Sequence, residues 1–359
     1  MLRYDPAVFA VGNDYQIAVT SKTQAFISIK VGNELFIDDS NGILCSASKT
    51  HIFSVPQELL EKEKHYTVIE KGIIKRLPYF SRTRADKFYE YDFIPVPEKA
   101  PVAYHISDTH NLVSEPVAAA NAYGDFDFLI LNGDVPNDTG RPENLYVVFD
   151  IISQLTHGTK PVVFSRGNHD LRGICAEMFA QYTPSRDGKT YYSFRLGKLW
   201  GICLDCGEDK PDSNEEYGCT VACHQFRIKE TEYIKEVIAN AGSEYNAPDV
   251  THRIIIAHNP FTRHYPAPFN IEEDLYSEWA KMLKENVKPD VMICGHTHRY
   301  SIDEPGCEND ALGQPCPIVV AAYKDDKTVG GAAFTFDEKE IGIVFTDNKG
   351  FREEHKIKL

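Results

Sequence analysis

Five short segments of the sequence carry side chains of the types that bind metal ions. Each contains His, Asp or Asn, and together they are Asp108-Thr109-His110, Gly133-Asp134, Gly167-Asn168-His169-Asp170, Ala257-His258-Asn259 and Gly295-His296-Thr297-His298. Residues at positions i and i+2 of an extended chain project to the same side. The Asp-x-His and His-x-His pairs therefore each direct two ligand-type side chains the same way.

The mixture of donor atoms limits which metals fit. Imidazole nitrogens combined with carboxylate and amide oxygens suit Mn, Fe, Zn or Ni, whereas Ca and Mg prefer oxygen ligands. Even four His, two Asp and one Asn from these segments would be more ligands than one tetrahedral ion needs. We therefore expect two ions about 3.5–4 Å apart that share one bridging carboxylate.

All but one of these segments follow directly after a short apolar run that is typical of a buried strand. The predicted strands cover residues 102–107, 128–132, 162–165, 199–204, 254–257 and 291–294. Helical periodicity is predicted between them, at residues 112–123, 143–155, 224–239 and 272–285. Strand–helix alternation indicates an α/β domain, and the carboxyl ends of its strands converge on one crevice. Further strands are expected at 318–323, 332–336 and 341–345.

The first hundred residues have a different pattern. Apolar residues alternate with polar ones at 15–19, 27–31, 66–68 and 89–93, which is typical of strands with one face in a core. Only residues 57–64 are expected to be helical. Pro95, Pro97 and Pro101 then form a stiff linker. We expect a small all-β sandwich of immunoglobulin or fibronectin type at residues 1–97, followed by the α/β domain at residues 98–359.

Composition excludes several classes of protein. The chain has 359 residues, 42% of them hydrophobic, and a net charge of −15. This acidity argues against a nucleic-acid partner, although a local basic patch stays open. No apolar run approaches the ~20 residues that span a bilayer, so no membrane partner is expected. Nine cysteines and a start without a secretory pattern favour the cytoplasm; export with a removed signal peptide is the alternative.

The ordered set of five segments resembles the calcineurin-like metallophosphoesterase superfamily, and a β-sandwich before such a domain is similar to the purple acid phosphatase layout. The resemblance implies an αββα sandwich with a dinuclear site at the sheet edges. It also implies the ligands: one metal would be held by Asp108, His110 and His298, the other by Asn168, His258 and His296, with Asp134 bridging. His169 would donate a proton to the leaving oxygen, and Asn168, His169 and His264 would contact the substrate.

Two departures from the family pattern matter. Asn137 stands where purple acid phosphatases have a metal-ligating tyrosine, so the protein should not be purple. Many phosphatases of the superfamily have an Asp-Arg pair there, which leaves Asp138 and Asp170 as candidates for orienting His169. Arg166 has two open interpretations, a phosphate clamp or a structural salt bridge.

We expect a metal-dependent phosphoesterase that acts on small phosphomonoesters. Its two Mn, Fe or Zn ions would activate water, because no Ser-His-Asp order or reactive cysteine supplies a nucleophile. Three alternatives are open: a phosphodiesterase on nucleotide or glycerol diesters, a non-catalytic scaffold, and a binding role of the N-terminal sandwich. A sugar-binding role of the N-terminal sandwich could not rest on tryptophan side chains, since Trp200 is the first tryptophan of the chain. The sequence does not determine the oligomeric state.

Overall fold

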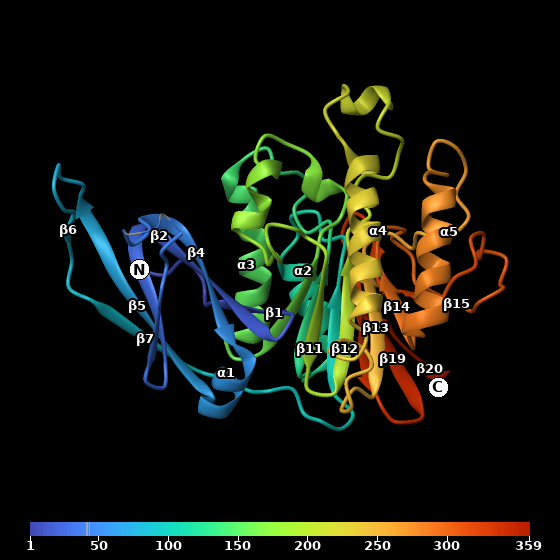
Figure 1. Cartoon of the computed structure of the whole chain (residues 1–359), viewed down its shortest axis with the longest axis horizontal. Coiled ribbons are helices and arrows are strands. Elements are labelled where there is room, and N and C mark those ends of the chain that lie inside the picture. The colour runs from blue at the N-terminus through green and yellow to red at the C-terminus, as the bar shows by residue number, and fades with distance from the viewer. Residues whose placement is uncertain (41, 43) are drawn as a thin grey trace.

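The computed structural model describes residues 1–40, 42 and 44–359. Within these residues the strands form two sheets, with helices against their outer faces (Figure 1). The larger sheet has 14 strands in this part of the chain, and its main path is β20-β19-β18-β8-β9-β10-β1-β2-β5-β6. The smaller sheet has six, in the order β11-β12-β13-β14-β16-β15.

The strands of the larger sheet come from both ends of the chain. They are β1 (Ala7–Val11), β2 (Asp14–Val31), β3 (Glu34–Ile37), β4 (Ser48–Pro56), β5 (His65–Lys75), β6 (Arg82–Thr83), β7 (Lys87–Asp92), β8 (Val102–Ile106), β9 (Phe128–Asn132), β10 (Pro161–Ser165), β17 (Tyr323–Lys324), β18 (Val329–Phe336), β19 (Glu340–Asp347) and β20 (Arg352–Lys358). The smaller sheet contains β11 (Tyr192–Leu196), β12 (Leu199–Leu204), β13 (His252–Ala257), β14 (Val291–Cys294), β15 (Ser301–Asp303) and β16 (Ile318–Val320).

The helices lie where the periodicity predicts them. They are α1 (Gln57–Glu63), α2 (Ser114–Tyr123), α3 (Pro142–Thr156), α4 (Cys223–Ala239) and α5 (Glu273–Met282), with short 3₁₀ segments η1 (His169–Leu171), η2 (Ala176–Gln181) and η3 (Glu215–Tyr217) and a π-helical turn η4 (Leu283–Val287). Helix α3 shows why: Pro142 suits the first turn, where no backbone donor is needed. Its buried residues include Leu145, Val148, Phe149 and Ile152, at helical spacing.

Three hydrophobic clusters define the layers. The first lies between the two sheets and joins residues such as Ile130 and Phe334 to Cys203 and Ile254. The second packs α2 and α3 on the larger sheet, and the third packs α4 and α5 on the smaller one through Trp279. The order is therefore helix, sheet, sheet, helix, and the predicted α/β class is confirmed.

The N-terminal region is rich in strands, as predicted, but it is continuous with the larger sheet. Strand β1 pairs in parallel with β10 and antiparallel with β2, so it joins the N-terminal strands to the α/β layers. The physical reason is its composition: all five residues of Ala7–Val11 are apolar or small and buried, which is typical of a strand covered on both faces. The boundary between two domains at residue 97 stays a prediction.

The topology brings the predicted segments to one place. Strands β8, β9 and β10 are mutually parallel in the larger sheet, and β13 and β14 are parallel in the smaller one. Their carboxyl ends therefore lie at one edge of each sheet, and the loops that follow them meet there. Among the described residues, no helix has the length and apolar character needed to cross a membrane.

Candidate metal centre

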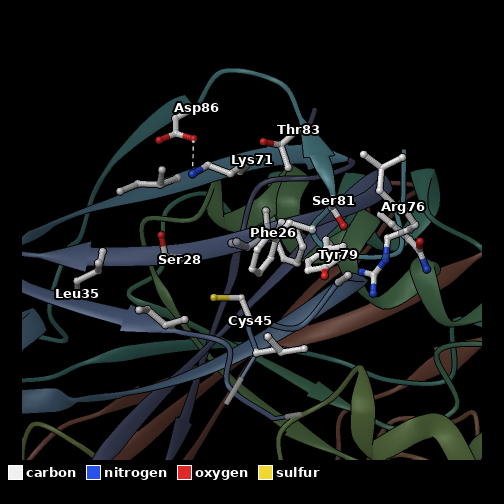
Figure 2. A pocket seen from close by; sticks show the side chains of 18 residues that line it. Phe26, Ser28, Leu35, Cys45, Lys71, Arg76, Tyr79, Ser81, Thr83 and Asp86 are labelled. Atoms are coloured by element: carbon white, nitrogen blue, oxygen red, sulfur yellow. Dashed lines mark ion pairs between the residues drawn. The ribbon is translucent and has the colours of Figure 1, made fainter. Parts of the chain in front are cut away.

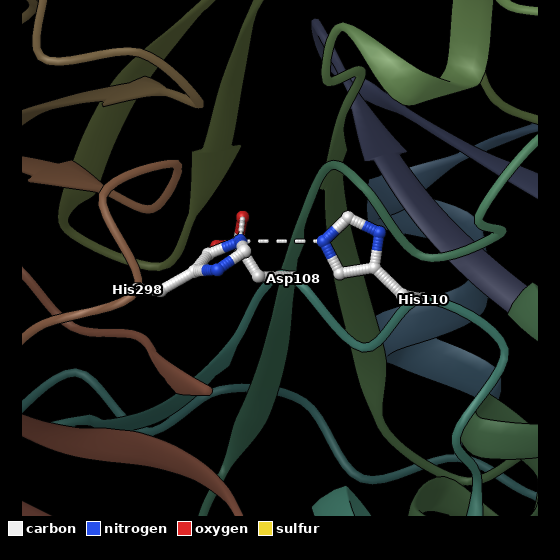
Figure 3. A group of neighbouring side chains, drawn as sticks. All are labelled: Asp108, His110 and His298. Atoms are coloured by element: carbon white, nitrogen blue, oxygen red, sulfur yellow. Dashed lines mark hydrogen bonds and ion pairs between the residues drawn. The ribbon is translucent and has the colours of Figure 1, made fainter. Parts of the chain in front are cut away.

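The loops after β8, β9, β10, β13 and β14 bring the predicted ligands together. One group of donor atoms comes from Asp108, His110 and His298, which lie within 4.8 Å of one another (Figure 3). His298 Nε2 is 3.1 Å from Asp108 Oδ1 and 3.3 Å from His110 Nε2. These three residues are the set that the family resemblance assigned to one metal.

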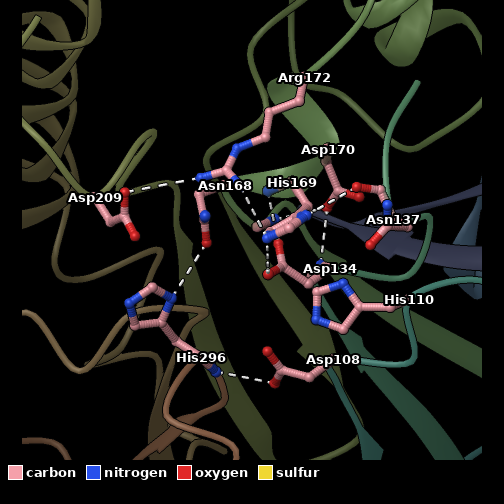
Figure 4. Close-up of polar contacts among 12 residues, drawn as sticks. Asp108, His110, Asp134, Asn137, Asn168, His169, Asp170, Arg172, Asp209 and His296 are labelled. Carbon is pink, nitrogen blue, oxygen red and sulfur yellow. Dashed lines mark hydrogen bonds and ion pairs between the residues drawn. The ribbon is translucent and has the colours of Figure 1, made fainter. Parts of the chain in front are cut away.

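The remaining ligands lie beside this group, and Figure 4 shows three of them, Asp134, Asn168 and His296. His258 Nε2 is 3.3 Å from Asp134 Oδ2 and 3.8 Å from Asp108 Oδ1. His296 Nδ1 lies 3.2 Å from the Asn168 side-chain oxygen, and the His258 and His296 rings are 5.4 Å apart between centroids. All seven predicted ligands therefore belong to one cluster, with Asp108 and Asp134 at its centre.

Each central carboxylate has one oxygen held by the protein and one directed into the cluster. Asp108 Oδ2 accepts hydrogen bonds from the Ser107 hydroxyl at 2.6 Å and from the His296 backbone N–H at 2.9 Å. Asp134 Oδ1 accepts from the His169 backbone N–H at 2.8 Å. Oδ1 of Asp108 and Oδ2 of Asp134 are left facing the imidazoles. Such secondary contacts orient metal ligands and are typical of metal sites.

His258 is oriented in the same manner. Its Nδ1–H donates to the Asn132 carbonyl at 2.8 Å, which directs Nε2 toward the carboxylates. Burial opposes a charge on this ring, but the carboxylates of Asp134 and Asp108 outweigh burial and raise the pKa of His258 to about 10. A positive charge is thus stabilised at this point, and a cation can replace the proton.

The other two central histidines behave in the opposite way. Burial lowers the pKa of His110 and of His296 to about 4. Both rings are therefore neutral at physiological pH and keep a nitrogen lone pair available for a metal. Burial also opposes ionisation of Asp108, yet the charge on His258 and the contact with His298 hold the pKa of Asp108 well below the usual range.

The loops that carry the ligands have strained backbones. Five of the seven ligands have positive φ, between 44° and 69°: Asp108, His110, Asp134, His296 and His298. This left-handed region is costly for residues with a Cβ atom and is concentrated at functional sites. The turns that follow the strands therefore position these side chains for metal binding, and the strained backbone lowers local stability.

The donor set fits a transition metal. Asp108 Oδ1 and His258 Nε2 are buried, and neither makes a hydrogen bond to any described residue. Buried polar atoms without a partner are costly, and a cation between them would remove that cost. His110 Nε2 and His298 Nε2 face each other at 3.3 Å, as two imidazoles do when they bind one cation.

His169 lies at the edge of this cluster, with its Nε2 4.0 Å from Asp134 Oδ2. Its Nδ1 is 2.8 Å from the Asn137 carbonyl oxygen, which can only accept, so Nδ1 carries the hydrogen. Its Nε2 accepts a hydrogen bond from Arg172 Nη1 at 3.0 Å. The proton acceptor that orients the ring is thus a backbone carbonyl.

Neither aspartate proposed from the sequence has that role in the structure. The Asp138 carboxylate accepts from the Gly140 backbone N–H and the Asn144 amide. Asp170 is buried, and its Oδ2 accepts from the backbone N–H groups of Asp134 and Gly167. Both aspartates shape the loops around the metal centre. The Asn137 carbonyl oxygen accepts from the ring instead, while both carboxylates accept hydrogen bonds from loop N–H groups.

Arg166 forms a salt bridge in the structure, and a different arginine, Arg172, lies beside His169. Arg166 Nε pairs with the buried Asp205 at 2.7 Å, which corresponds to the salt-bridge interpretation. Arg172 was not considered from the sequence, yet its guanidinium lies beside His169. Two parallel hydrogen bonds of 2.9 Å to Glu208 fix it there. The signal was the spacing of three from His169, because the 3₁₀ turn η1 aligns such residues.

Two further side chains differ from expectation. His264 is exposed, and its backbone N–H donates to Asn309; its contact with substrate stays a prediction. The next residue, Tyr265, faces the cluster instead, with its ring centroid 6.3 Å from that of His296. Its hydroxyl donates to the Asn259 side chain at 3.2 Å. Adjacent residues of an extended loop point to opposite sides, which explains the exchange.

Comparison with known proteins agrees with this geometry. The family model described as calcineurin-like phosphoesterase matches residues 102–300, more than half of the chain. The chain belongs to this family. The matched region contains all seven predicted ligands together with His169 and Arg172. As a family member, the protein is a metal-dependent phosphoric ester hydrolase.

The chain is also similar to solved structures, and the first of these shows the same fold. A purple acid phosphatase from yellow lupin (Lupinus luteus) seeds is 16% identical and has a TM-score of 0.63, covering 99% of this chain and 74% of that one. Vacuolar Protein Sorting 29 from Cryptosporidium parvum is 11% identical with a TM-score of 0.37, covering 73% of this chain and 98% of that one. Among curated proteins, none matches this chain.

Proposed function

We propose that this family member hydrolyses small phosphomonoesters at a centre of two transition-metal ions, Mn, Fe or Zn. The ligands of one ion would be Asp108, His110 and His298, those of the other Asn168, His258 and His296, and Asp134 would bridge them. When bound, the two ions would lower the pKa of a water molecule and neutralise charge on the phosphoryl oxygens. The support is the convergence of seven donor side chains, four buried and three partly buried, on one cluster.

His169 is the proton donor to the leaving oxygen in this proposal. Its ring is 25% exposed and lies next to Asp134, so it reaches both the cluster and the solvent. The Asn137 carbonyl holds Nδ1–H and thereby directs Nε2 toward the centre. For proton donation Nε2 must carry a hydrogen, so Arg172 has to turn its N–H away from the ring. After that turn, the Arg172 N–H would donate to a phosphoryl oxygen of the substrate.

Arg172 is the observation that favours a monoester. A terminal phosphate carries two negative charges, whereas a diester carries one. Two metal ions can neutralise either a monoester or a diester. The additional guanidinium beside His169 favours the monoester, because it is a dianion. Its side chain is 28% exposed, so it is accessible to a substrate that enters the cluster.

The substrate class is tested by comparing p-nitrophenyl phosphate with bis-p-nitrophenyl phosphate after loading with Mn. We expect kcat/KM to be higher for the monoester. A tenfold preference for the diester, equal to about 1.4 kcal/mol of transition-state binding, would reverse the choice and favour the phosphodiesterase. Elemental analysis of the same sample separates both from a non-catalytic scaffold, which should hold less than one metal ion per chain.

The proton donor is tested with His169→Ala. General acid catalysis contributes about 10²–10⁴-fold, and an alkoxide needs the proton more than a nitrophenolate does. The variant should therefore lose more activity on an alkyl phosphate than on an aryl phosphate while keeping its metal content. An equal loss on both substrates would contradict the role given to His169.

A further inference from the structure

Residues 71–88 form a strongly basic segment of an acidic protein, and we call this segment the basic arm. It contains six Lys or Arg residues and one Asp, a net charge of +5, while the rest of the chain carries −20. All six cationic side chains are exposed. Lys71 pairs with Asp86 at 3.4 Å; among the described residues, no ion pair involves the other five. The average acidity of the chain hides this local charge.

The basic arm also exposes large apolar side chains. Tyr79 is 92% exposed, Phe80 77%, Phe88 62%, Ile74 51% and Leu77 46%. Single exposed apolar residues are ordinary on protein surfaces, but a contiguous set marks an interaction site. Cationic and apolar side chains are interspersed along residues 74–84, so one partner can contact both kinds.

A groove of about 1050 Å³ lies beside the basic arm (Figure 2). Its walls are mainly apolar and include Phe26, Leu35, Ile37 and Ile69, while Lys71 and Arg76 belong to its lining. An apolar hollow next to cationic groups matches a partner that is both hydrophobic and anionic.

The basic arm lies at one end of the molecule. Strands β5, β6 and β7 project away from the α/β layers, and the tip near β6 is remote from α5 (Figure 1). In the larger sheet β6 ends the main path at the side opposite to β20. A large flat partner can therefore contact this end without meeting the rest of the acidic body.

We propose that the basic arm docks the protein onto a bilayer that contains anionic phospholipid. Clustered Lys and Arg residues bind such surfaces, and neighbouring aromatic and aliphatic side chains insert at the boundary between headgroups and acyl chains. Nucleic acid would use the cations and the aromatic rings, but not Ile74, Leu77 or the apolar groove. Two basic arms repel each other, which disfavours a symmetric contact between copies through this surface. The inference differs from the expectation that the chain has no membrane partner, which was drawn from the absence of a bilayer-spanning apolar run; docking onto a membrane surface needs no such run.

Vesicle flotation of the full chain tests this docking. We expect co-flotation with vesicles of phosphatidylcholine plus phosphatidylserine, weaker binding at high salt, and no binding to phosphatidylcholine alone. Each Lys or Arg near an anionic surface contributes about fivefold to binding, so Arg82→Gln/Arg84→Gln should lose about 25-fold. Tyr79→Ser/Phe80→Ser should lose about tenfold or more, because two large apolar groups no longer insert.

The matched control is Arg352→Gln/Lys356→Gln, which removes two positive charges from β20, where the side chains are 46% and 66% exposed. It should bind vesicles like the parent, and all three double variants should keep the parent activity on p-nitrophenyl phosphate. Absence of binding to phosphatidylserine vesicles, or an equal loss in the control, would overturn the proposal. So would tighter binding of a single-stranded RNA oligonucleotide, or a dimer in sedimentation that Tyr79→Ser/Phe80→Ser abolishes without any vesicle binding.

Discussion

Arg172 should supply a positive charge that the substrate uses in the transition state. Removing one preorganised donor from a developing negative charge typically costs about 2.7–4 kcal/mol, or about 10²–10³ in rate. In the proposed mechanism Arg172 is such a donor: its Nη1, now 3.0 Å from His169 Nε2, would turn to a phosphoryl oxygen while Glu208 holds the other edge of the guanidinium. Arg172→Ala should therefore lower kcat/KM on p-nitrophenyl phosphate by about 100-fold or more.

The substitution Arg172→Lys separates charge from geometry. Lysine keeps the positive charge but loses the planar fork that Glu208 holds through two hydrogen bonds. We expect an intermediate loss of about tenfold, close to the 1.4 kcal/mol that corresponds to that factor.

Glu208 is a positioning residue in this argument. It is 2% exposed, and the Tyr217 hydroxyl also donates to its carboxylate at 3.1 Å. Glu208→Gln keeps one acceptor oxygen and loses the charge that anchors Arg172. Its effect should appear mainly in kcat, because the guanidinium can still contact a bound phosphate but is no longer aligned for the transition state.

The assay compares kcat and KM for p-nitrophenyl phosphate and bis-p-nitrophenyl phosphate with Mn-loaded protein whose metal content has been measured. Arg352→Ala, on β20, is the matched control for the loss of an arginine. The diester should be less sensitive to Arg172→Ala because it carries one charge fewer. A loss below about threefold on the monoester, or an identical loss on both esters at full metal content, would refute the role of Arg172.

Three further predictions concern the metal centre and the folded state. Asp134→Asn should weaken metal binding at both sites at once, as measured by metal titration. The loss of affinity should be at least the roughly 10–100-fold that follows when a residue hydrogen-bonded to a metal ligand is removed. Gly167→Ala should also lose metal, although it removes no ligand, because a Cβ there would lie 2.3 Å from Asp134 Oδ1; Gly242→Ala, in open space, is its control. Burial and the charge on Asp205 raise the pKa of Glu230. In the folded protein the Glu230 carboxyl therefore stays protonated at pH values at which it is already ionised in the unfolded chain. Stability is then lost as pH rises, and Glu230→Gln should gain up to about 1.4 kcal/mol per pH unit over the parent in urea unfolding.

Each of these predictions has a result that would contradict it. Two tightly held ions and full turnover in Asp134→Asn would exclude it as the bridging ligand. Normal metal content in Gly167→Ala would show that the loop can move aside without displacing the carboxylate. A stability difference between Glu230→Gln and the parent that is the same at pH 5 and pH 8 would mean that Glu230 is ionised in the folded protein.

Much of the metal centre could be predicted from the sequence. Metal ligands need particular side-chain types, and alternation in an extended chain places Asp108 with His110 and His296 with His298 on common sides. The apolar runs before each segment predicted the strands, and parallel strands bring their carboxyl ends to one edge. The four helices of the α/β layers were predicted for the same reason, since their buried faces repeat at helical spacing.

The N-terminal strands show where local pattern is insufficient. The alternating runs predicted at residues 15–19 and 27–31 both lie in the single strand β2. An alternating pattern predicts a strand but does not show which strand it pairs with. The continuous apolar run of β1 was the available signal for a place between β10 and β2. A strand pairs with the neighbour that lets the whole molecule bury the most apolar surface. Its own sequence pattern does not determine that neighbour.

The sequence by itself determined the ligand types, their order along the chain and the α/β layers, because these follow from local spacing and periodicity. Only the tertiary structure decided what surrounds His169. Its ring is held by the main-chain oxygen of Asn137, which every residue has and which the sequence therefore cannot single out. Arg172 faces it because Glu208, from a different loop, fixes the guanidinium. Contacts between distant loops depend on how the sheets pack, and they carry the proposed selectivity of this phosphoesterase.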